Sequence, residues 1–173
     1  MFNMLNIITL ITFSVVPNYT PCCIQAFIDW DYSGDICLNE LASLDGNVLQ
    51  VFNNDVENES IYTVQIIGST DKSFHVSVFN YEYDFIGKGF IEKAHVCVYS
   101  MPYHKSNRII LYSSDSTESK IVCDIENEYK KIFVLDARNS WIKAKVITHN
   151  NFYIGWLPPD NQCGDIYTSC CGE

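Results

Sequence analysis

The chain has 173 residues, of which 47% are hydrophobic and 18% are charged. This composition supports a buried core and excludes a disordered chain. Eleven basic and 21 acidic residues give a formal net charge of −10, which argues against a nucleic-acid backbone as the main partner because phosphate binding needs positive charge. An acidic protein of this kind suits a cation or a basic protein as its partner.

The N-terminal segment reads as a signal peptide. Residues 1–28 carry no charged side chain and include the ten-residue apolar run Ile7–Val16. Such a run is about half of the roughly 20 residues that cross a bilayer, and it fits the core of a secretory signal. The small residue Ala26 ends the sequence Ile-Gln-Ala, which suits cleavage. We expect residues 1–26 to be a signal peptide and the protein to be periplasmic or extracellular; a buried N-terminal strand is the alternative.

Residues 29–40 have the spacing of an EF-hand calcium loop. Oxygen-bearing side chains fall on its positions one, three, five, seven and twelve, with Gly34 at position six, where the loop bends. Ca²⁺ takes six to eight oxygen ligands, and alternate residues of a tight loop can supply them. We predict a Ca²⁺ site in this loop; a solvated acidic turn is the alternative. The predicted ligands are Asp29, Asp31, Ser33, Asp35 (through its carbonyl) and Glu40.

A short helix is predicted after the loop. Leu38, Leu41 and Leu44 recur at helical spacing, and Asp45-Gly46 follows them. Residues 27–45 would then form the calcium loop and its helix. Beyond residue 46, short stretches rich in β-branched and aromatic residues alternate with polar turns, which is typical of a β-barrel or sandwich.

A weak internal repeat runs through this β-rich region. Three matches occur in the same order: 49–60 with 109–120, Ser73–Val78 with Ser140–Lys145, and Gly89–Ile91 with Gly155–Leu157. They favour the duplication of a unit of about 50 residues. A chance alignment of unrelated strands is the alternative.

The second unit resembles a bacterial SH3-like domain. The resemblance rests on the stretch Leu111-Tyr112, on the strand with Trp141 and Lys143, and on the closing Gly155-Trp156-Leu157. The first unit departs from it, with Phe74 and Phe90 in the two tryptophan places. The order of segments is similar to that of uncharacterised exported proteins of Bacteroides-type bacteria.

This resemblance implies a mainly β fold of two small SH3-like barrels, preceded by the calcium loop and short helix. The first unit would cover 46–96 and the second 107–160, with a connector at 97–106 and a Cys-rich tail at 161–173. It also implies a binding module. Trp141 and Trp156 would then either pack in the core or form the aromatic floor of a peptide groove.

Six cysteines remain if the chain is cleaved after Ala26, and an even number in an exported protein favours disulfides. We expect Cys163 to close a loop with Cys170 or Cys171; free thiols are the alternative. The others are Cys37, Cys97 and Cys123. No Cys-x-x-Cys is present, so a structural zinc site has little support.

The sequence gives little support for catalysis. His95 and Cys97 stand two residues apart, but no third residue that would orient such a pair is evident. Phosphate-loop, Gly-x-Ser-x-Gly and His-Glu-x-x-His motifs do not occur. We therefore expect no catalytic residues.

These observations predict an exported, non-catalytic, calcium-binding protein whose SH3-like modules bind a cell-wall peptide or a protein partner. Nucleic acid is not expected as a partner, and after cleavage the chain would not be an integral membrane protein. The alternative is an inhibitor or immunity protein that masks a secreted toxin or a cell-wall hydrolase.

Overall fold

The computed structural model describes residues 24–29, 31–42, 47–52, 61–100, 108–126 and 131–164. Within these ranges the chain forms one antiparallel sheet of thirteen strands and two short 3₁₀ helices, so the predicted mainly β fold is confirmed. The strands of the first half are β1 Ile24–Ile28, β2 Ile36–Asn39, β3 Val48–Phe52, β4 Thr63–Ser69, β5 Ser73–Phe79 and β6 Phe85–Glu92, followed by helix η1 Lys93–His95. The remaining elements are β7 Val96–Ser100, β8 Arg108–Tyr112, β9 Ile121–Glu126, β10 Lys131–Arg138, β11 Trp141–Ile147, β12 Phe152–Leu157, η2 Pro159–Asn161 and β13 Gln162–Cys163.

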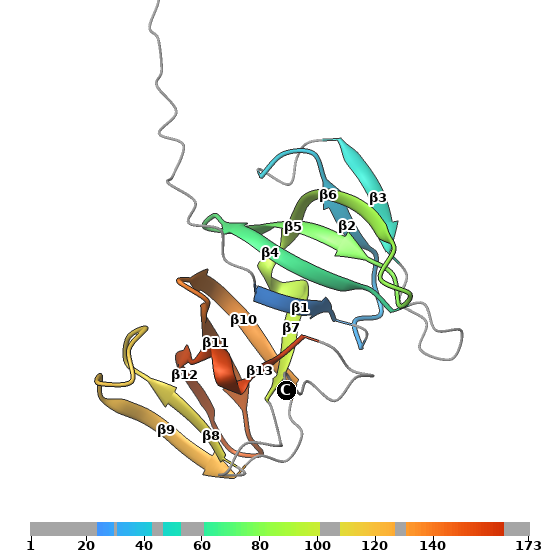
Figure 1. Ribbon diagram of the computed structural model, residues 1–173. Helices are drawn as coiled ribbons and strands as arrows, with labels where there is room; N and C mark the ends of the chain where they lie inside the picture. The colour runs from blue at the N-terminus through green and yellow to red at the C-terminus, as the bar shows by residue number, and fades with distance from the viewer. Residues whose placement is uncertain are drawn as a thin grey trace, which may run out of the picture.

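The two halves of the sheet repeat one strand order. Counted inward from one edge the order is β3-β2-β6-β5-β4-β1, and from the other edge it is β9-β8-β12-β11-β10-β7. Each strand of the first half therefore has a counterpart six strands later. In Figure 1 the two sets lie at opposite ends of the molecule, with β1 and β7 between them. A 3₁₀ helix precedes β7, which pairs with β1, just as another precedes β13, which pairs with β7.

The repeat extends to the irregularities of the sheet. The β2–β3 ladder shifts register after Leu38, and the β8–β9 ladder shifts after Leu111. The β4–β5 ladder shifts after Ile66, and the β10–β11 ladder shifts after Val134. Because a bulge is a local departure from the pleat, two unrelated sets of strands would not share two of them at matching positions. The β5–β6 ladder also shifts after Val78, whereas the β11–β12 ladder has no shift. The strand order and the two shared shifts support the internal repeat predicted from the sequence.

The pairings correct the register of one repeat match. Phe74 pairs with Ile91, and Ile142 pairs with Leu157, so Phe74 is the counterpart of Ile142 and not of Trp141. Neighbouring residues of a strand point to opposite faces, and a shift of one residue exchanges inward for outward side chains. Phe74 and Ile142 are fully buried, whereas Trp141 is partly exposed.

Inward side chains from both halves form one continuous hydrophobic core, which includes Val64, Val76, Val98, Leu111, Val134 and Val146. Strands β4, β5 and β11 alternate buried and less buried residues, as a sheet with one buried face requires. Gly89 and Gly155 stand at equivalent places. A Cβ there would lie 2.6 Å from the Asn39 carbonyl oxygen and 2.9 Å from that of Tyr112, so glycine lets β6 approach β2 and β12 approach β8.

Several finer expectations differ from the structure. The helix predicted over 38–44 is wrong for its described part, because Leu38 is buried in β2 and Leu41, just after that strand, is 55% exposed. The match of 49–60 with 109–120 is wrong by one strand, because residues 49–52 belong to β3 and residues 109–112 to β8, whereas the counterpart of β3 is β9.

The described strands form one open sheet and do not establish two separate barrels. Residues 97–100 of the expected connector belong to β7. Among the described residues, no helix is long and apolar enough to span a membrane.

The start of the fold bears on the signal-peptide prediction. Ile24, Gln25 and Ala26 pair with β4, and Ile24 and Ala26 are buried. Cleavage after Ala26 would remove three of the five residues of β1. A cut before Ile24 leaves the strand intact and fits the sheet better. Residues 1–23 lie outside the described residues, so export itself stays a prediction.

We expect a chain that begins at Phe27 to be less stable than one that begins at Ile24. The shorter chain loses two buried side chains and part of the β1–β4 ladder, which should cost about 3 kcal/mol of the free energy of unfolding. Urea unfolding of the two truncated proteins measures the difference. Equal midpoints would contradict a structural role for Ile24–Ala26.

Candidate functional site

The opening loop is tied to β10 by one lysine. The Lys131 Nζ lies 2.6 Å from Asp29 Oδ1 and 2.7 Å from Asp31 Oδ2. The Asp29 side chain is only 9% exposed, and its backbone N–H donates to the His95 carbonyl at 2.8 Å. Burial lowers the pKa of Lys131, but its hydrogen bonds to the two carboxylates outweigh this and leave that pKa raised. The lysine is therefore held as a cation between Asp29 and Asp31.

The other predicted calcium ligands are exposed and take no part in the two ion pairs of this lysine. Ser33 and Asp35 are exposed in the loop, and Glu40 follows β2 and accepts a hydrogen bond from Asn47 Nδ2 at 3.0 Å. A strand advances about 3.3 Å per residue, which puts Glu40 roughly 13 Å beyond Ile36. In the described part of the chain, no three His, Cys, Asp or Glu residues are placed to hold a metal ion. Calcium binding stays a prediction from the sequence pattern.

Replacing Lys131 by Met should destabilise the protein. The nearly buried Asp29 carboxylate would lose its cation, which should cost about 3 kcal/mol. Lys143→Met removes an exposed lysine of β11 and should have little effect. Urea unfolding of both variants measures the difference, and similar midpoints would contradict the role of Lys131.

The same variant sharpens the calcium prediction. In the unaltered protein, calcium would compete with the Lys131 ammonium for Asp29 and Asp31. Calcium should therefore raise the melting temperature of Lys131→Met more than that of the unaltered protein. Melting temperatures that are the same in calcium and in chelator, for both proteins, would contradict a calcium site here.

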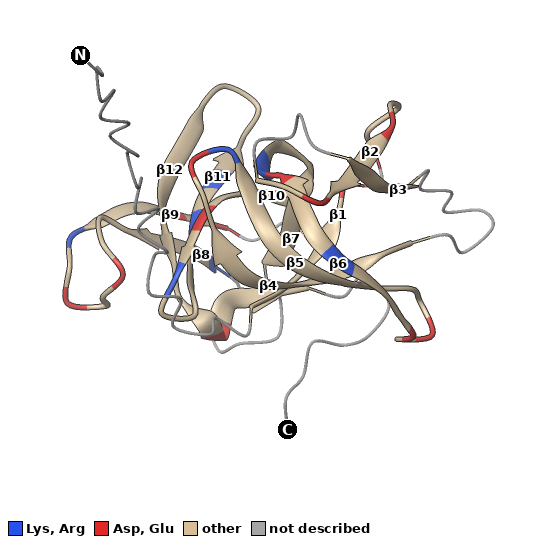
Figure 2. Ribbon diagram, turned by 90° about the horizontal axis from the view of Figure 1, so that it is seen from above, with Lys and Arg blue, Asp and Glu red and all other residues tan. Residues whose placement is uncertain are grey.

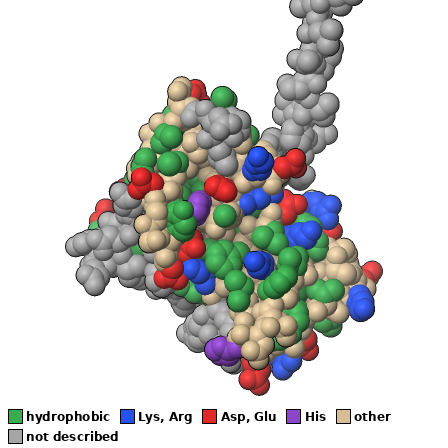
Figure 3. Space-filling model, turned by 180° about the vertical axis from the view of Figure 1, so that it is seen from behind, with side chains coloured by type: hydrophobic (Ala, Val, Ile, Leu, Met, Phe, Trp, Pro, Cys, Tyr) green, Lys and Arg blue, Asp and Glu red, His purple; other side chains and the backbone are tan. Residues whose placement is uncertain are grey.

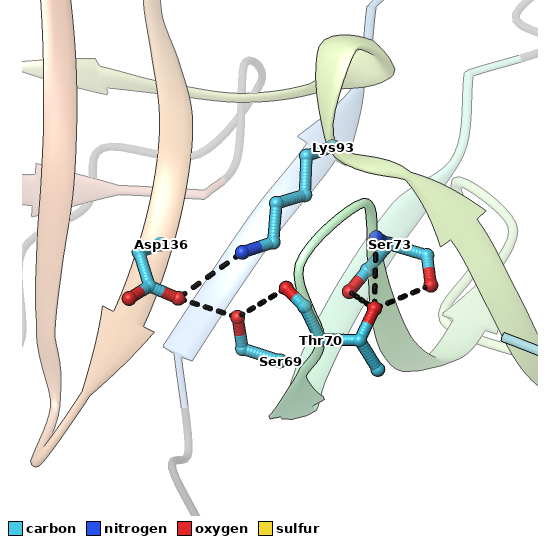
Figure 4. Close-up of polar contacts among 5 residues, drawn as sticks. All are labelled: Ser69, Thr70, Ser73, Lys93 and Asp136. Carbon is cyan, nitrogen blue, oxygen red and sulfur yellow. Dashed lines mark hydrogen bonds and ion pairs between the residues drawn. The ribbon is translucent and has the colours of Figure 1, made fainter.

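A second polar cluster joins the halves at Asp136 (Figure 4). Asp136 on β10 accepts hydrogen bonds from Ser69 Oγ at 2.5 Å and from Lys93 Nζ at 3.2 Å. Next to it, Thr70 Oγ1 accepts from the Ser73 backbone N–H at 3.0 Å. Burial raises the pKa of Asp136, but the Ser69 hydroxyl and the Lys93 charge outweigh burial and leave that pKa below its ordinary value. The cluster therefore favours a charged Asp136.

Asp136→Asn should lower the melting temperature at neutral pH by about 2 °C, because it removes a partly exposed ion pair. The folded-state pKa of Asp136 is below its unfolded value, so its contribution is present above pH 4 and is lost as pH falls through the folded pKa. The difference in melting temperature between Asp136→Asn and the unaltered protein should therefore become smaller in acid. A difference that stays constant from pH 7 to pH 2 would contradict this account.

The His95 and Cys97 side chains occupy different environments. His95 packs against Tyr32, with ring centroids 4.3 Å apart, and its Nε2 is 3.8 Å from Glu92 Oε2. Cys97 is fully buried in β7. Burial, followed by the nearby Asp29 charge, raises the pKa of its thiol. A buried neutral thiol is poorly suited to attack a substrate.

The cysteines are mostly unpaired where the structure describes them. Cys37, Cys97 and Cys123 are free thiols, so the expectation of disulfides is wrong for these three. Cys163 lies in β13 and is 6% exposed. Its expected partners Cys170 and Cys171 lie outside the described residues, so that loop stays a prediction.

An aromatic cluster covers the outer face of the second half. Tyr112 meets Trp141 edge-on with centroids 5.8 Å apart, and Trp156 pairs with Tyr112 across β8 and β12. The Arg138 guanidinium lies 4.8 Å from the centre of the Trp156 ring and 3.0 Å from Asp115 Oδ1. Trp156 is 8% exposed, while Tyr112 and Trp141 are partly exposed.

A tight turn sets the position of Trp141. Asn139 and Ser140, between β10 and β11, both have positive φ, 51° and 65°. Two such residues are typical of the type I′ turn, whose twist matches that of the strands. Gln162 Nε2 donates to the Ser140 carbonyl at 2.9 Å. The turn is thus fixed, and Arg138 and Trp141 face each other across the hairpin.

Hydrophobic side chains are also exposed elsewhere. Figure 3 shows them gathered near the middle of one face, with basic side chains among and around them. Exposed large hydrophobic residues include Val48, Leu49, Val51, Tyr81, Tyr83, Phe85, Ile121 and Phe152. Those of β3 and β9 lie on the two edges of the sheet.

Comparison with known proteins leaves the family open. No family model matches the sequence, and no curated protein matches it. Among solved structures, the chain is similar to NlpC2 from Trichomonas vaginalis at 14% identity and a TM-score of 0.30. The match covers 80% of this chain and 46% of NlpC2, so the chain spans less than half the length of that protein. A TM-score of this size does not establish a shared fold.

Sequence reasoning found Trp141 and Trp156 but missed their partners. Arg138 and Tyr112 come from other strands, and Lys131 lies 100 residues from Asp31; no local pattern joins such residues. The run of alternating aromatic and polar residues at 79–85 was visible in the sequence. Its alternation indicates a strand, but in the structure residues 80–84 form the turn between β5 and β6.

Proposed function

We propose that this chain is an exported, non-catalytic binding protein of two SH3-like units. Its second unit would hold an extended segment of a cell-wall peptide or a partner protein at Trp141. The observation that carries the proposal is a difference between the halves. Positions that are small or polar in the first half are aromatic and partly exposed in the second.

The strand pairings define these equivalent positions. Asn39 pairs with Phe90 as Tyr112 pairs with Trp156, and Ser73 occupies the place of Trp141. These counterparts have different surroundings. Ser73 is fully buried and donates to the Ala42 carbonyl at 3.2 Å.

The duplicated core is thus formed without aromatic residues at two of the three places. Partly exposed tryptophan and tyrosine side chains, with a nearby arginine, are the residue types that dominate binding energy at protein interfaces. They also suit recognition of an extended peptide in an aromatic-lined groove. The cluster in the second half is therefore better explained by binding than by folding alone.

The SH3-like assignment rests on the sequence resemblance together with the strand order. In each half a hairpin, three further antiparallel strands and a 3₁₀ helix precede a strand that pairs back to the first. The burial of Cys97 supports a non-catalytic role, because the one thiol with a histidine close in sequence is withdrawn from solvent. Under this proposal the protein acts by binding a partner at its surface.

The test is binding to isolated peptidoglycan and to its soluble peptide fragments. Trp141→Ala should lower the bound fraction roughly tenfold, because truncating a central aromatic anchor costs about 1.4 kcal/mol or more. Phe152→Ala, which removes a 62% exposed ring from the same half, should leave binding unchanged. Equal binding by Trp141→Ala and the unaltered protein would overturn the site.

The alternative is an inhibitor or immunity protein that masks a secreted toxin or a cell-wall hydrolase. The net charge of −10 favours a basic partner under this alternative. Co-purification of such a protein, together with no binding to peptidoglycan, would favour it over the first proposal.

A further inference from the structure

The turn between β5 and β6 carries a cluster of exposed aromatic side chains. Tyr81 is 47% exposed, Tyr83 is 54% exposed and Phe85 is 61% exposed. Phe79 packs edge-on against Phe85 with ring centroids 5.9 Å apart. We call these four residues the aromatic turn. Its counterpart between β11 and β12 has the sequence Thr-His-Asn-Asn and carries no tyrosine.

The backbone of the aromatic turn is held in one conformation. The Asn80 N–H donates to the Asp84 carbonyl at 3.1 Å, and the Asp84 N–H donates to Asn80 Oδ1 at 2.8 Å. Tyr83 has a φ of 64°, which is an unfavourable region for a bulky residue. The hydrogen bonds therefore fix the backbone that carries the rings, and a preorganised backbone loses less entropy on binding.

A pocket of about 180 Å³ adjoins the aromatic turn. Phe79 and Tyr83 line one part of it, and Gln25, Thr63 and Gln65 supply neutral hydrogen-bonding groups from β1 and β4. Pockets for drug-sized ligands measure roughly 300 to 1,000 Å³, so this one suits a single side chain of a partner. Its aromatic and amide walls would accept a long side chain with a polar end.

The charges around the aromatic turn are negative. Glu82 and Asp84 alternate with the residues of the aromatic turn. Among the described residues, no ion pair joins either carboxylate to a cation. In Figure 2 the β5–β6 turn projects from the sheet with acidic residues at its tip. Lys88 is the basic residue of this hairpin, and it pairs with Ser77 beyond the bulge that follows Phe85.

We propose that the aromatic turn and its pocket bind a protein segment rich in arginine or lysine. A guanidinium or ammonium group would lie against the rings of Phe79 and Tyr83, because the face of an aromatic ring attracts a cation. The side-chain oxygens of Gln25 and Gln65 can accept its hydrogen bonds. Glu82 and Asp84 would draw the basic segment toward the turn. All but one of the pocket's lining residues belong to the first half, the exception being Gly164, and the proposal is independent of the proposed site at Trp141.

The test uses the full chain and a fluorescent nine-residue arginine peptide, with fluorescence anisotropy as the readout. The double variant Glu82→Gln/Asp84→Asn should weaken binding roughly tenfold. Glu118→Gln/Glu126→Gln removes the same charge from exposed positions of the second half and should change binding less than twofold. Equal weakening by the two pairs would overturn the proposal, because attraction would then follow only net charge.

Two further variants test the rings. Tyr83→Asn removes the ring but keeps a residue that tolerates positive φ, and Phe85→Ala removes the most exposed ring. Each should weaken peptide binding about fivefold or more. Thermal melts check that each variant is folded.

Phe152→Ala is the matched control from the counterpart strand, and it should bind the peptide as the unaltered protein does. If folded Tyr83→Asn and Phe85→Ala also bind unchanged, or if the unaltered protein does not bind the peptide, the proposal is wrong.

Discussion

The fold depends on β7, because this strand belongs to both halves of the duplication. It pairs with β1 on one side and with β10 on the other, and it also pairs with β13. Phe27 of β1 pairs with Cys97 of β7, and Tyr99 of β7 pairs with Cys163 of β13. Tyr99 is therefore the counterpart of Phe27, and Cys163 is the counterpart of Cys97. The rings of Phe27 and Tyr99 stack, with centroids 4.8 Å apart. A change in β7 would therefore act on both halves, whereas a change in an edge strand would act on one.

Sharing a strand also explains the position of the two ion pairs that join the halves. Lys131 of the second half pairs with Asp29 of the first, and Lys93 of the first half pairs with Asp136 of the second. Each half supplies one acid and one base on either side of the β1–β7–β10 junction. Ion pairs that are partly removed from water fix geometry more than they add stability. The two pairs therefore set how the halves meet, while the common core provides most of the stability.

The two halves share two register shifts and the glycines Gly89 and Gly155 but carry different side chains on their outer faces. Bulges and the close approach at Gly89 and Gly155 are requirements of the backbone, and both halves must meet them. Outer positions are less constrained, since solvent accepts many residue types. The second half has aromatic rings around Trp141, and the first half has them in the β5–β6 turn. One duplicated scaffold thus presents two different surfaces.

Sequence reasoning predicted the β-rich class, indicated an internal repeat and singled out Trp141 and Trp156. These follow from local composition, alternation and repetition, which need no knowledge of distant contacts. It did not determine the register of the repeat, because a slip of one residue, as between Trp141 and Ile142, leaves composition almost unchanged while exchanging the two faces. The sequence pattern also predicted a helix from Leu38, because three leucines fit a helical period. In the structure Leu38 belongs to β2.

Only the tertiary structure decided what the opening loop contacts. The spacing of Asp29, Asp31 and Glu40 is that of a calcium loop, yet in the structure Asp29 and Asp31 contact Lys131 of β10, and Glu40 follows β2 and contacts Asn47. A local pattern specifies which ligands a loop can offer; the strand that follows it and the side chain packed across from it decide which ones meet. The same holds for Arg138 over Trp156 and for the pocket beside Tyr83. Their parts lie on different strands, and they come together only because the sheet pairs those strands in one order.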